Sequence, residues 1–145
     1  MKLKMLYHGS PKKIKGKFLI PNKPQDLGKP IKKIKKGVYA THIKNNAIAM
    51  AIICSKGVIS GSLNFKKNKK AIIYEGWPKQ KYIYLYSFLS EGFIKESKKS
   101  SEWISQNKVR VIDVQKLKIN NYLNLLRKAT DKEIKRFFKK HNIKP

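Results

Sequence analysis

Short runs of β-branched and aromatic residues, separated by turn residues, fill the middle of the chain. Such side chains fit a pleated, half-buried surface, and Gly, Pro, Asn and Ser between the runs mark their ends. The pattern predicts six strands, at Leu3–Tyr7, Val38–Thr41, Val58–Leu63, Ala71–Tyr74, Tyr82–Phe88 and Val109–Val114. The segment Pro11–Lys36 shows little periodicity and is predicted to be a long loop.

Helical patterns occur once near the middle of the chain and twice near its end. Asn45 or Asn46 is predicted to cap a helix running to about Cys54, whose alanines allow close packing on a sheet. Two helices are predicted at the end, one over about Asn121–Lys128 and one beginning at Thr130 with a capping-box pattern. The spacing of the second helix predicts an apolar face in the core, made by Ile134, Phe137, Phe138 and His141.

This order of elements, strands first and helices last without regular alternation, predicts an α+β fold. The 145 residues suit a single domain over residues 1–145. The longest uncharged apolar stretch, Ala47–Ser55, is shorter than the roughly 20 residues of a membrane helix, so we expect a cytoplasmic protein without membrane contact. The single cysteine, Cys54, excludes an internal disulfide and a multi-cysteine zinc site, and is predicted to be buried.

The net charge of the chain indicates a negatively charged binding partner. The chain has 35 Lys and Arg against 8 Asp and Glu, a formal net charge of +27. An AT-rich genome would favour lysine codons, but it supplies Asp and Glu codons equally well, so the shortage of acids points to a negatively charged partner. Lysine binds phosphate as a point charge, whereas base-edge recognition relies on arginine. The sequence therefore predicts salt-sensitive, weakly sequence-specific binding to RNA or DNA.

Two segments combine polar side chains with glycine at predicted strand ends. Tyr7-His8-Gly9-Ser10 places an imidazole and a hydroxyl on a backbone that glycine allows to bend. Gly37-Val38-Tyr39-Ala40-Thr41 follows about thirty residues later. Together they predict a pocket for a polar small molecule, and the alternative is a plain strand-to-loop junction with His8 in a structural role.

These segments resemble motifs of the ADP-ribosyltransferase superfamily, in its small bacterial rifampin-ADP-ribosyltransferase-like branch. A third matching segment is Glu102-Trp103-Ile104-Ser105, ahead of the predicted strand at Val109–Val114. The resemblance covers most of the chain up to about Asp113 and leaves the C-terminal helices outside. It implies a split, curved antiparallel sheet that clasps NAD in a cleft, with a few flanking helices.

The resemblance also implies roles for individual residues. His8 would hydrogen-bond the hydroxyls of the nicotinamide-side ribose, and the Gly9 backbone would clamp the nicotinamide carboxamide with help from Ser10. Tyr39 would lie against the nicotinamide ring, and Thr41 belongs to the same cofactor-binding set.

Departure of nicotinamide leaves positive charge on the ribose, so the site needs an accepting group near the 2′-hydroxyl. Glu102 is the predicted catalytic acid, and the next candidates are Gln106, in the same turn, then Glu96 and then Glu75. A Glu-x-Glu pair, which arginine-modifying members of the superfamily carry, is missing. An arginine acceptor is therefore disfavoured, and a domain that only binds NAD remains open.

The leading hypothesis is an NAD-dependent ADP-ribosyltransferase acting on a nucleic acid or a nucleic-acid-bound factor. The diphosphate of NAD would be bound by loop lysines, for which Lys15, Lys17, Lys32 and Lys35 are candidates. A non-enzymatic basic nucleic-acid-binding protein is the main alternative. RNA 2′-phosphotransferase chemistry is a further alternative, although all three arginines lie at or after position 110. Whether an antitoxin or immunity partner exists, as for a toxin, stays open.

Overall fold

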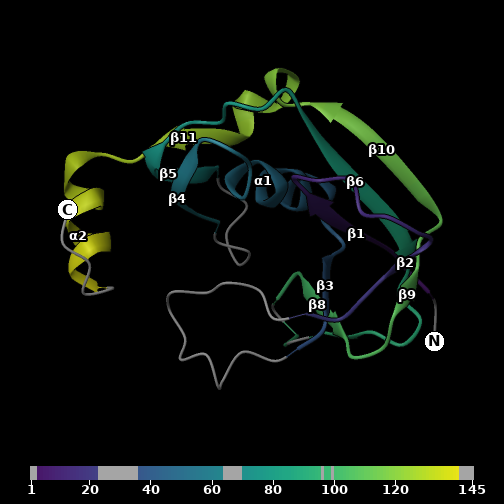
Figure 1. Ribbon diagram of the computed structural model, residues 1–145. Helices are drawn as coiled ribbons and strands as arrows, with labels where there is room; N and C mark the ends of the chain where they lie inside the picture. Colours follow the sequence, from purple (N-terminus) through teal and green to yellow (C-terminus); the bar gives the residue numbers. More distant parts are fainter. Residues whose placement is uncertain (1–2, 23–35, 64–69, 96, 99, 141–145) are drawn as a thin grey trace.

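The fold is α+β, as the order of predicted elements suggested. It is known from a computed structural model that describes residues 3–22, 36–63, 70–95, 97–98 and 100–140 (Figure 1). Strands in mostly antiparallel sheets account for most of the described part of the chain, together with two α-helices and one 3₁₀ helix. Within these residues, no helix has the length and apolar character needed to cross a membrane.

The largest sheet has six strands, all paired antiparallel, in the order β10-β6-β1-β3-β8-β7. The strands are β1 (Met5–Ser10), β3 (Val38–Thr41), β6 (Tyr82–Leu89), β7 (Ile94–Lys95), β8 (Glu102–Ser105) and β10 (Asp113–Lys118). The N-terminal strand β1 is therefore central, between β6 and β3.

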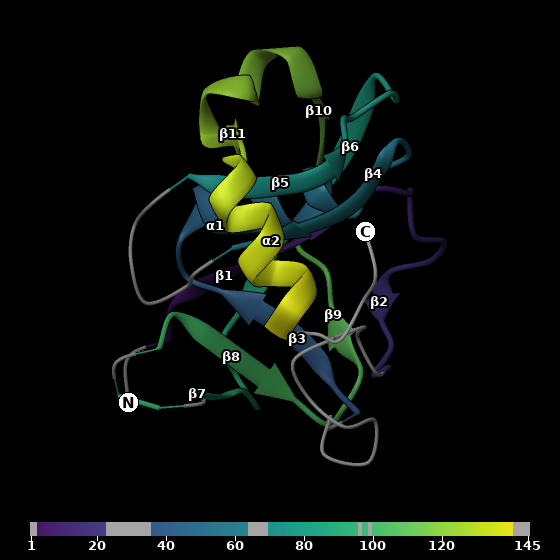
Figure 2. The same cartoon turned by 90° about the vertical axis from the view of Figure 1, so that its left-hand side faces the viewer.

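Two smaller sheets complete the fold. A three-stranded sheet has the order β11-β5-β4, formed by β4 (Val58–Ser62), β5 (Ala71–Gly76) and β11 (Leu126–Lys128), with β11 parallel to β5. The short strands β2 (Phe18–Leu19) and β9 (Val109–Arg110) form the third sheet. In Figure 2 the three-stranded sheet lies in the upper half of the view, as do β6 and β10 of the large sheet, while β3, β8 and β7 lie below and β2 and β9 lie to the right.

Helix α1 (Lys44–Ile53) lies between the two larger sheets and forms one core with both of them. Its alanines permit this close packing, and so does Gly9 on β1. A Cβ atom at Gly9 would overlap the backbone carbonyl of Ala47 and lie 2.8 Å from the Cβ of Ala51. Positive φ angles occur at other glycines, so Gly9 is required here for close approach and not for a bend.

The opposite face of β1, β3 and β6 carries a second core. Its buried members are Leu6, Leu19, Val38, Ala40, Tyr86, Phe88 and Val109. Strands β2 and β9 supply two of these residues and so cover this face. The large sheet is therefore packed on both faces.

Two predictions around α1 need correction. The helix begins at Lys44 with Ile43 as its N-cap, so Asn45 and Asn46 lie inside the first turn. Asn46 is buried instead, and its amide donates to the Ser101 hydroxyl at 3.4 Å. Cys54, which follows the helix, is exposed rather than buried.

Three predictions in the C-terminal half also need correction. Residues 109–114 form two strands, because Val111 N–H donates to Lys17 while Ile112 N–H donates to Ser87 of the large sheet. The predicted helix over 121–128 is a 3₁₀ helix, η2 (Ile119–Leu125), followed by β11. Glu102 does not precede the last strand but begins a strand of its own, β8.

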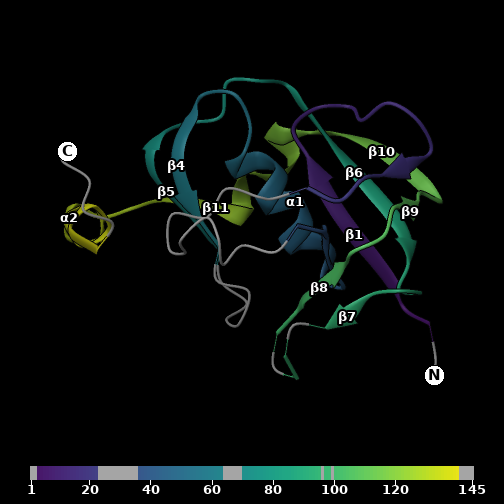
Figure 3. The same cartoon turned by 60° about the horizontal axis from the view of Figure 1, so that its bottom comes forward.

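Helix α2 (Asp131–Lys140) has the predicted capping box but lies outside the core. Glu133 N–H donates to Thr130 Oγ1 at 3.2 Å, and Thr130 N–H donates to Glu133 Oε1 at 2.9 Å. None of its residues is buried, and Phe137 stacks on Tyr74 of β5 with ring centroids 4.1 Å apart. The predicted apolar face thus meets the three-stranded sheet at its central strand, on the side away from α1 (Figure 3). His141 lies outside the described residues.

Candidate functional site

The three sequence motifs lie on three neighbouring strands, β1, β3 and β8. Tyr7 pairs with Thr41, and Thr41 pairs with Glu102, so these residues form one row across the sheet. His8 is one position beyond this row. Adjacent strands are about 4.8 Å apart, so the backbones of His8 and Glu102 are separated by roughly 10 Å.

The sheet opens beside His8. All six residues of β1 pair with β6, whereas the described register between β1 and β3 contains the single pair Tyr7–Thr41. Beyond that pair, the backbones of Gly9 and Ser10 have no registered partner on β3. The sheet therefore leaves a stretch of strand edge at the position where the resemblance predicts the nicotinamide.

His8 is held at this opening by the backbone of β3. Its Nδ1 lies 2.7 Å from the carbonyl oxygen of Tyr39, so Nδ1 carries the proton and Nε2 is left as an acceptor. Burial lowers the pKa of His8 below its usual range, and the hydrogen bond to Tyr39 opposes part of that shift. A neutral imidazole with a free accepting nitrogen is suited to a hydroxyl donor.

Strand alternation separates the side chains of the candidate site. Tyr39, Thr41 and Glu102 share the face of the sheet that carries Tyr7 and α1, because cross-strand partners point the same way. His8 follows Tyr7 and so alternates to the other face, but its bond to Tyr39 directs the ring along the sheet toward β3.

The two predicted hydroxyl groups hydrogen-bond nearby backbone. Ser10 Oγ donates to the Lys12 carbonyl at 2.7 Å and accepts from Lys12 N–H at 3.2 Å. Thr41 Oγ1 accepts from Ile43 N–H at 3.1 Å, just before α1. Both residues are buried, and these bonds shape the turns that follow β1 and β3.

The predicted catalytic pair is not brought together. Glu102 is the first residue of β8, is half-buried and donates its backbone N–H to Ser100 Oγ at 3.0 Å. Gln106 is exposed beyond the other end of β8, and four residues of strand span about 13 Å. Gln106 instead lines a cavity of about 490 Å³ with Ile20, Pro21 and Lys36.

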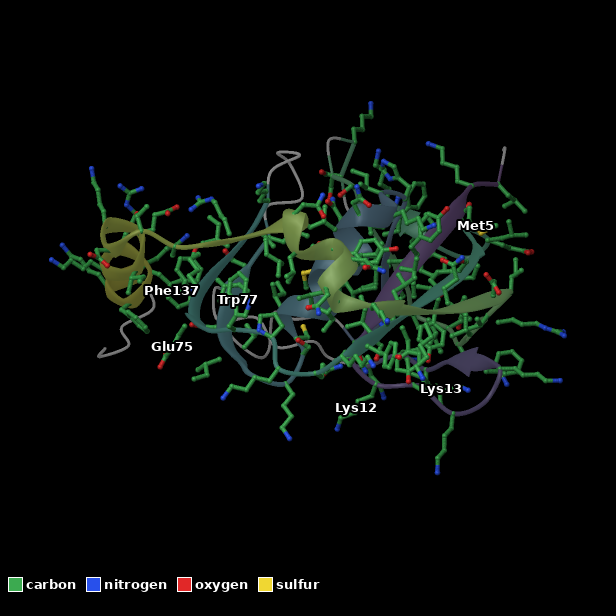
Figure 4. The ribbon with its side chains drawn as sticks, turned by 90° about the horizontal axis from the view of Figure 1, so that it is seen from above. Met5, Lys12, Lys13, Glu75, Trp77 and Phe137 are labelled. Carbon is green, nitrogen blue, oxygen red and sulfur yellow. The ribbon has the colours of Figure 1, made fainter. Side chains whose placement is uncertain are left out.

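The remaining predicted site residues are not on β1, β3 or β8, or lie outside the residues that the structure describes. Glu75 is exposed on β5, at the end of the molecule that carries Phe137 (Figure 4). Lys15 and Lys17 are exposed in the segment between β1 and β2, which also carries Lys12 and Lys13. Glu96, Lys32 and Lys35 lie outside the described residues.

One cluster, centred on Trp103, has no counterpart in the sequence analysis. The Trp103 indole N–H donates to His42 Nδ1 at 3.1 Å, and Lys4 and Lys95 both lie over the Trp103 ring. These residues come from four separate segments, so no local sequence pattern marks the cluster. Only the pairing of β3 with β8 and of β8 with β7 assembles it.

No protein-family model, curated protein or solved structure matches the chain. Within the part of the chain that the structure describes, no group of three or more His, Cys, Asp or Glu side chains is placed to hold a metal ion. Functional argument therefore rests on the geometry of the motifs.

Proposed function

We propose that this protein is an NAD-dependent ADP-ribosyltransferase whose acceptor is a nucleic acid or a nucleic-acid-associated factor. The observation that carries the proposal is the neutral His8, held by Tyr39 at the point where β1 and β3 separate, with Glu102 two strands away. This arrangement offers an accepting imidazole on β1 and a carboxylate on β8, with strand β3 between them.

In the proposed reaction, His8, Gly9 and Glu102 each have one role. His8 Nε2 accepts a hydrogen bond from a hydroxyl of the nicotinamide-side ribose, and the unpaired backbone edge at Gly9 receives the carboxamide. The bond from ribose C1′ to the nicotinamide nitrogen breaks, and its electron pair leaves with nicotinamide. An acceptor oxygen or nitrogen forms the new bond to C1′ and releases its proton. Glu102 stabilises the positive charge that develops on the ribose, through the 2′-hydroxyl.

A nucleic-acid acceptor is supported by unbalanced charge. The chain has 35 Lys and Arg against 8 Asp and Glu, and the salt bridge found among the described residues joins Arg127 to Glu133. Most described lysines are therefore available to an external anion. Such a surface concentrates a polyanion by long-range attraction that added salt screens.

The test is release of nicotinamide from NAD by the purified protein, alone and with total RNA, DNA or cell lysate. We expect release that depends on one of these additions and falls at least about 100-fold in Glu102→Gln, a typical effect of removing one transition-state stabilising group. His8→Ala is expected to weaken NAD binding and release together. Glu75→Gln, a matched loss of charge on another sheet, should retain full activity.

Absence of release under every condition, together with no NAD-dependent rise in melting temperature, would overturn the proposal. Gly9→Ala is unsuitable for this test, because the added methyl group disturbs α1 whether or not NAD binds.

The second candidate, a non-enzymatic nucleic-acid-binding protein, is favoured by exposed lysines over aromatic rings. Lys116 lies 4.2 Å from the Tyr82 ring centroid and Lys108 lies 4.7 Å from that of Phe18. Under this alternative, His8 and Glu102 variants bind RNA or DNA as the wild type does, and NAD does not stabilise the protein.

RNA 2′-phosphotransferase chemistry has less support from the geometry. Arg110 lies on β9, Arg136 lies on α2, and Arg127 is paired with Glu133. None of these arginines is on β1, β3 or β8.

A further inference from the structure

We propose that Lys4, His42, Lys95 and Trp103 form a subsite for single-stranded nucleic acid, in which the cationic side chains bind a phosphate and the indole ring stacks with a base. This group of four residues is called the Trp103 cluster below. It lies where the start of β1 and the end of β3 meet β7 and β8, at the margin of the large sheet (Figure 3).

Two ammonium groups converge on one ring in this cluster. Lys4 Nζ and Lys95 Nζ are each 5.9 Å from the centroid of the Trp103 ring. Neither forms a salt bridge with an acidic residue that the structure describes, while Lys95 Nζ donates to the Lys98 carbonyl at 3.1 Å. Two ammonium groups beside one ring, with no acidic partner among the described residues, favour the binding of an anion there.

His42 supplies a third donor. Its Nδ1 accepts the indole N–H of Trp103 at 3.1 Å, so the ring carries its proton on Nε2. Burial, followed by the charges of Lys95 and Lys4, lowers the pKa of His42 below its usual range. Because the positive neighbours disfavour the imidazolium, a phosphate bound among them would raise that pKa again.

The aromatic ring distinguishes a nucleic acid from a simple phosphate. Trp103 is half-buried against the second core and is fixed at both ends, by β8 and by its bond to His42. The lysines above it have flexible stems, so they can turn to flanking phosphates and leave the ring face to a base. Base–aromatic stacking beside a cationic groove is the usual means of holding single strands without sequence preference.

The inference rests on the proposed function only in naming the strand as the acceptor. Trp103 follows Glu102 directly in β8, and the two side chains point to opposite faces of the sheet, so a strand bound at the cluster reaches the proposed catalytic carboxylate only by passing around the start of β8. Binding itself needs no NAD. Its failure and the failure of the transferase proposal are therefore distinguishable.

The test is binding of a fluorescein-labelled 12-mer, as U12 RNA or as dT12 DNA, measured by anisotropy without NAD over a range of salt concentrations. Lys4→Gln with Lys95→Gln is expected to weaken binding at least about tenfold and to reduce the salt slope by about 1.4, or 0.7 for each lost phosphate contact. The matched control is Lys132→Gln with Lys135→Gln, which removes equal charge from two exposed lysines of α2. This control should change affinity less than about threefold and leave the slope near the wild-type value.

Tryptophan fluorescence and NMR test whether the 12-mer binds at the Trp103 cluster. Trp103 is one of two tryptophans, so Trp77→Phe makes its fluorescence the only tryptophan signal, and we expect that signal to be quenched as either 12-mer binds. In the wild-type protein, NMR titration should show a higher pKa of His42 when the 12-mer is bound. This measurement needs no variant, so it does not depend on whether Trp77→Phe folds normally.

Equal weakening by the two double variants would overturn the inference, since it would mean general attraction by a basic surface. An unchanged His42 pKa in the complex would also overturn it. The inference would likewise be overturned if millimolar inorganic phosphate raised the pKa of His42 as much as a 12-mer does and displaced neither 12-mer. A preference for U12 over dT12, or the reverse, leaves the subsite in place and identifies the strand.

Discussion

At the scale of single residues, Gly9 shows how one position can serve packing and ligand binding together. Its missing side chain lets the backbone of α1 approach β1, because a Cβ atom there would overlap the Ala47 carbonyl. The same bare backbone edge is the proposed contact for the carboxamide. A glycine at this position therefore cannot by itself identify a ligand site.

Gly9→Ala is expected to destabilise the fold by about 1–3 kcal/mol, the usual cost of overpacking a well-packed interior. The atom in the way belongs to backbone, so a rotamer change cannot relieve the overlap. Urea unfolding followed by circular dichroism measures the effect. A variant as stable as the wild type would show that α1 can shift without cost.

His8 makes stability depend on pH in a definite direction. Burial lowers the pKa of His8 in the folded state, so the unfolded chain binds more protons as the pH falls through about 6.5. Stability should therefore decrease from pH 7.5 to pH 5, and His8→Gln should flatten that dependence. Urea midpoints at both pH values test this.

His42 is the control for the previous experiment. Its pKa is also lowered, so it contributes to the pH dependence with the same sign. His42→Gln should remove only its own share. A wild-type-like slope in His8→Gln would contradict the assignment of a buried, neutral His8.

At the scale of elements, α2 differs from α1 because it has no buried residue, whereas most residues of α1 are buried. It is held by the stack of Phe137 on Tyr74 and by two hydrogen bonds from Arg127 to Glu133, both of 2.7 Å. Contacts so few and so exposed are typical of a segment that opens without global unfolding.

Phe137→Ala is expected to release α2 while leaving the rest of the molecule folded. Amide hydrogen exchange should accelerate in 131–140 and remain slow in β1 and β6, with a global stability change below about 1 kcal/mol, as for most exposed sites. Phe138→Ala, the neighbouring ring, is the matched comparison. Loss of protection in β6 would mean that α2 is part of the cooperative unit.

Lowering the pH provides a second test of how α2 is attached to the rest of the molecule. The hydrogen bonds from Arg127, followed by those from Thr130, lower the pKa of Glu133 to about 2. The stabilisation is thus present above the usual glutamate pKa of about 4.3 and is lost as the pH falls toward 2. Exchange in α2 should accelerate across that window in the wild type, and Glu133→Gln should show no such step.

At the scale of the whole molecule, a net charge of +27 on 145 residues opposes folding by self-repulsion. Salt screens this repulsion, with a Debye length near 30 Å at 0.01 M and near 8 Å at 0.15 M. The melting temperature should therefore rise between these concentrations, in NaCl as in KCl. A decrease would mean that attractive pairs outweigh the repulsion.

Local patterns predicted the elements whose stability is local, and missed those defined by distant partners. The strands at 38–41, 58–62 and 82–89 were foreseen because β-branched and aromatic runs mark them. The strand β11 was predicted as part of a helix, because its sequence Leu-Arg-Lys has no β character and only its pairing with β5 makes it a strand.

The candidate site could be predicted as a set of motifs but not as a geometry. The bond from His8 to the Tyr39 carbonyl follows from the separation of β1 and β3, which no periodicity marks. Gln106 was predicted to lie in the same turn as Glu102 because the two are near in sequence, yet an extended strand separates them. The Trp103 cluster joins residues up to 99 positions apart (Lys4 to Trp103), so sequence proximity could not reveal it.

The central place of β1 also bears on how the protein is made. This strand leaves the ribosome first, yet its full-length partner, β6, does not begin until Tyr82, and Glu102 comes later still. A nascent chain therefore carries His8 and Gly9 without the sheet that positions them until β6 has been made. On the proposed function, no catalytic site exists before β8 has followed.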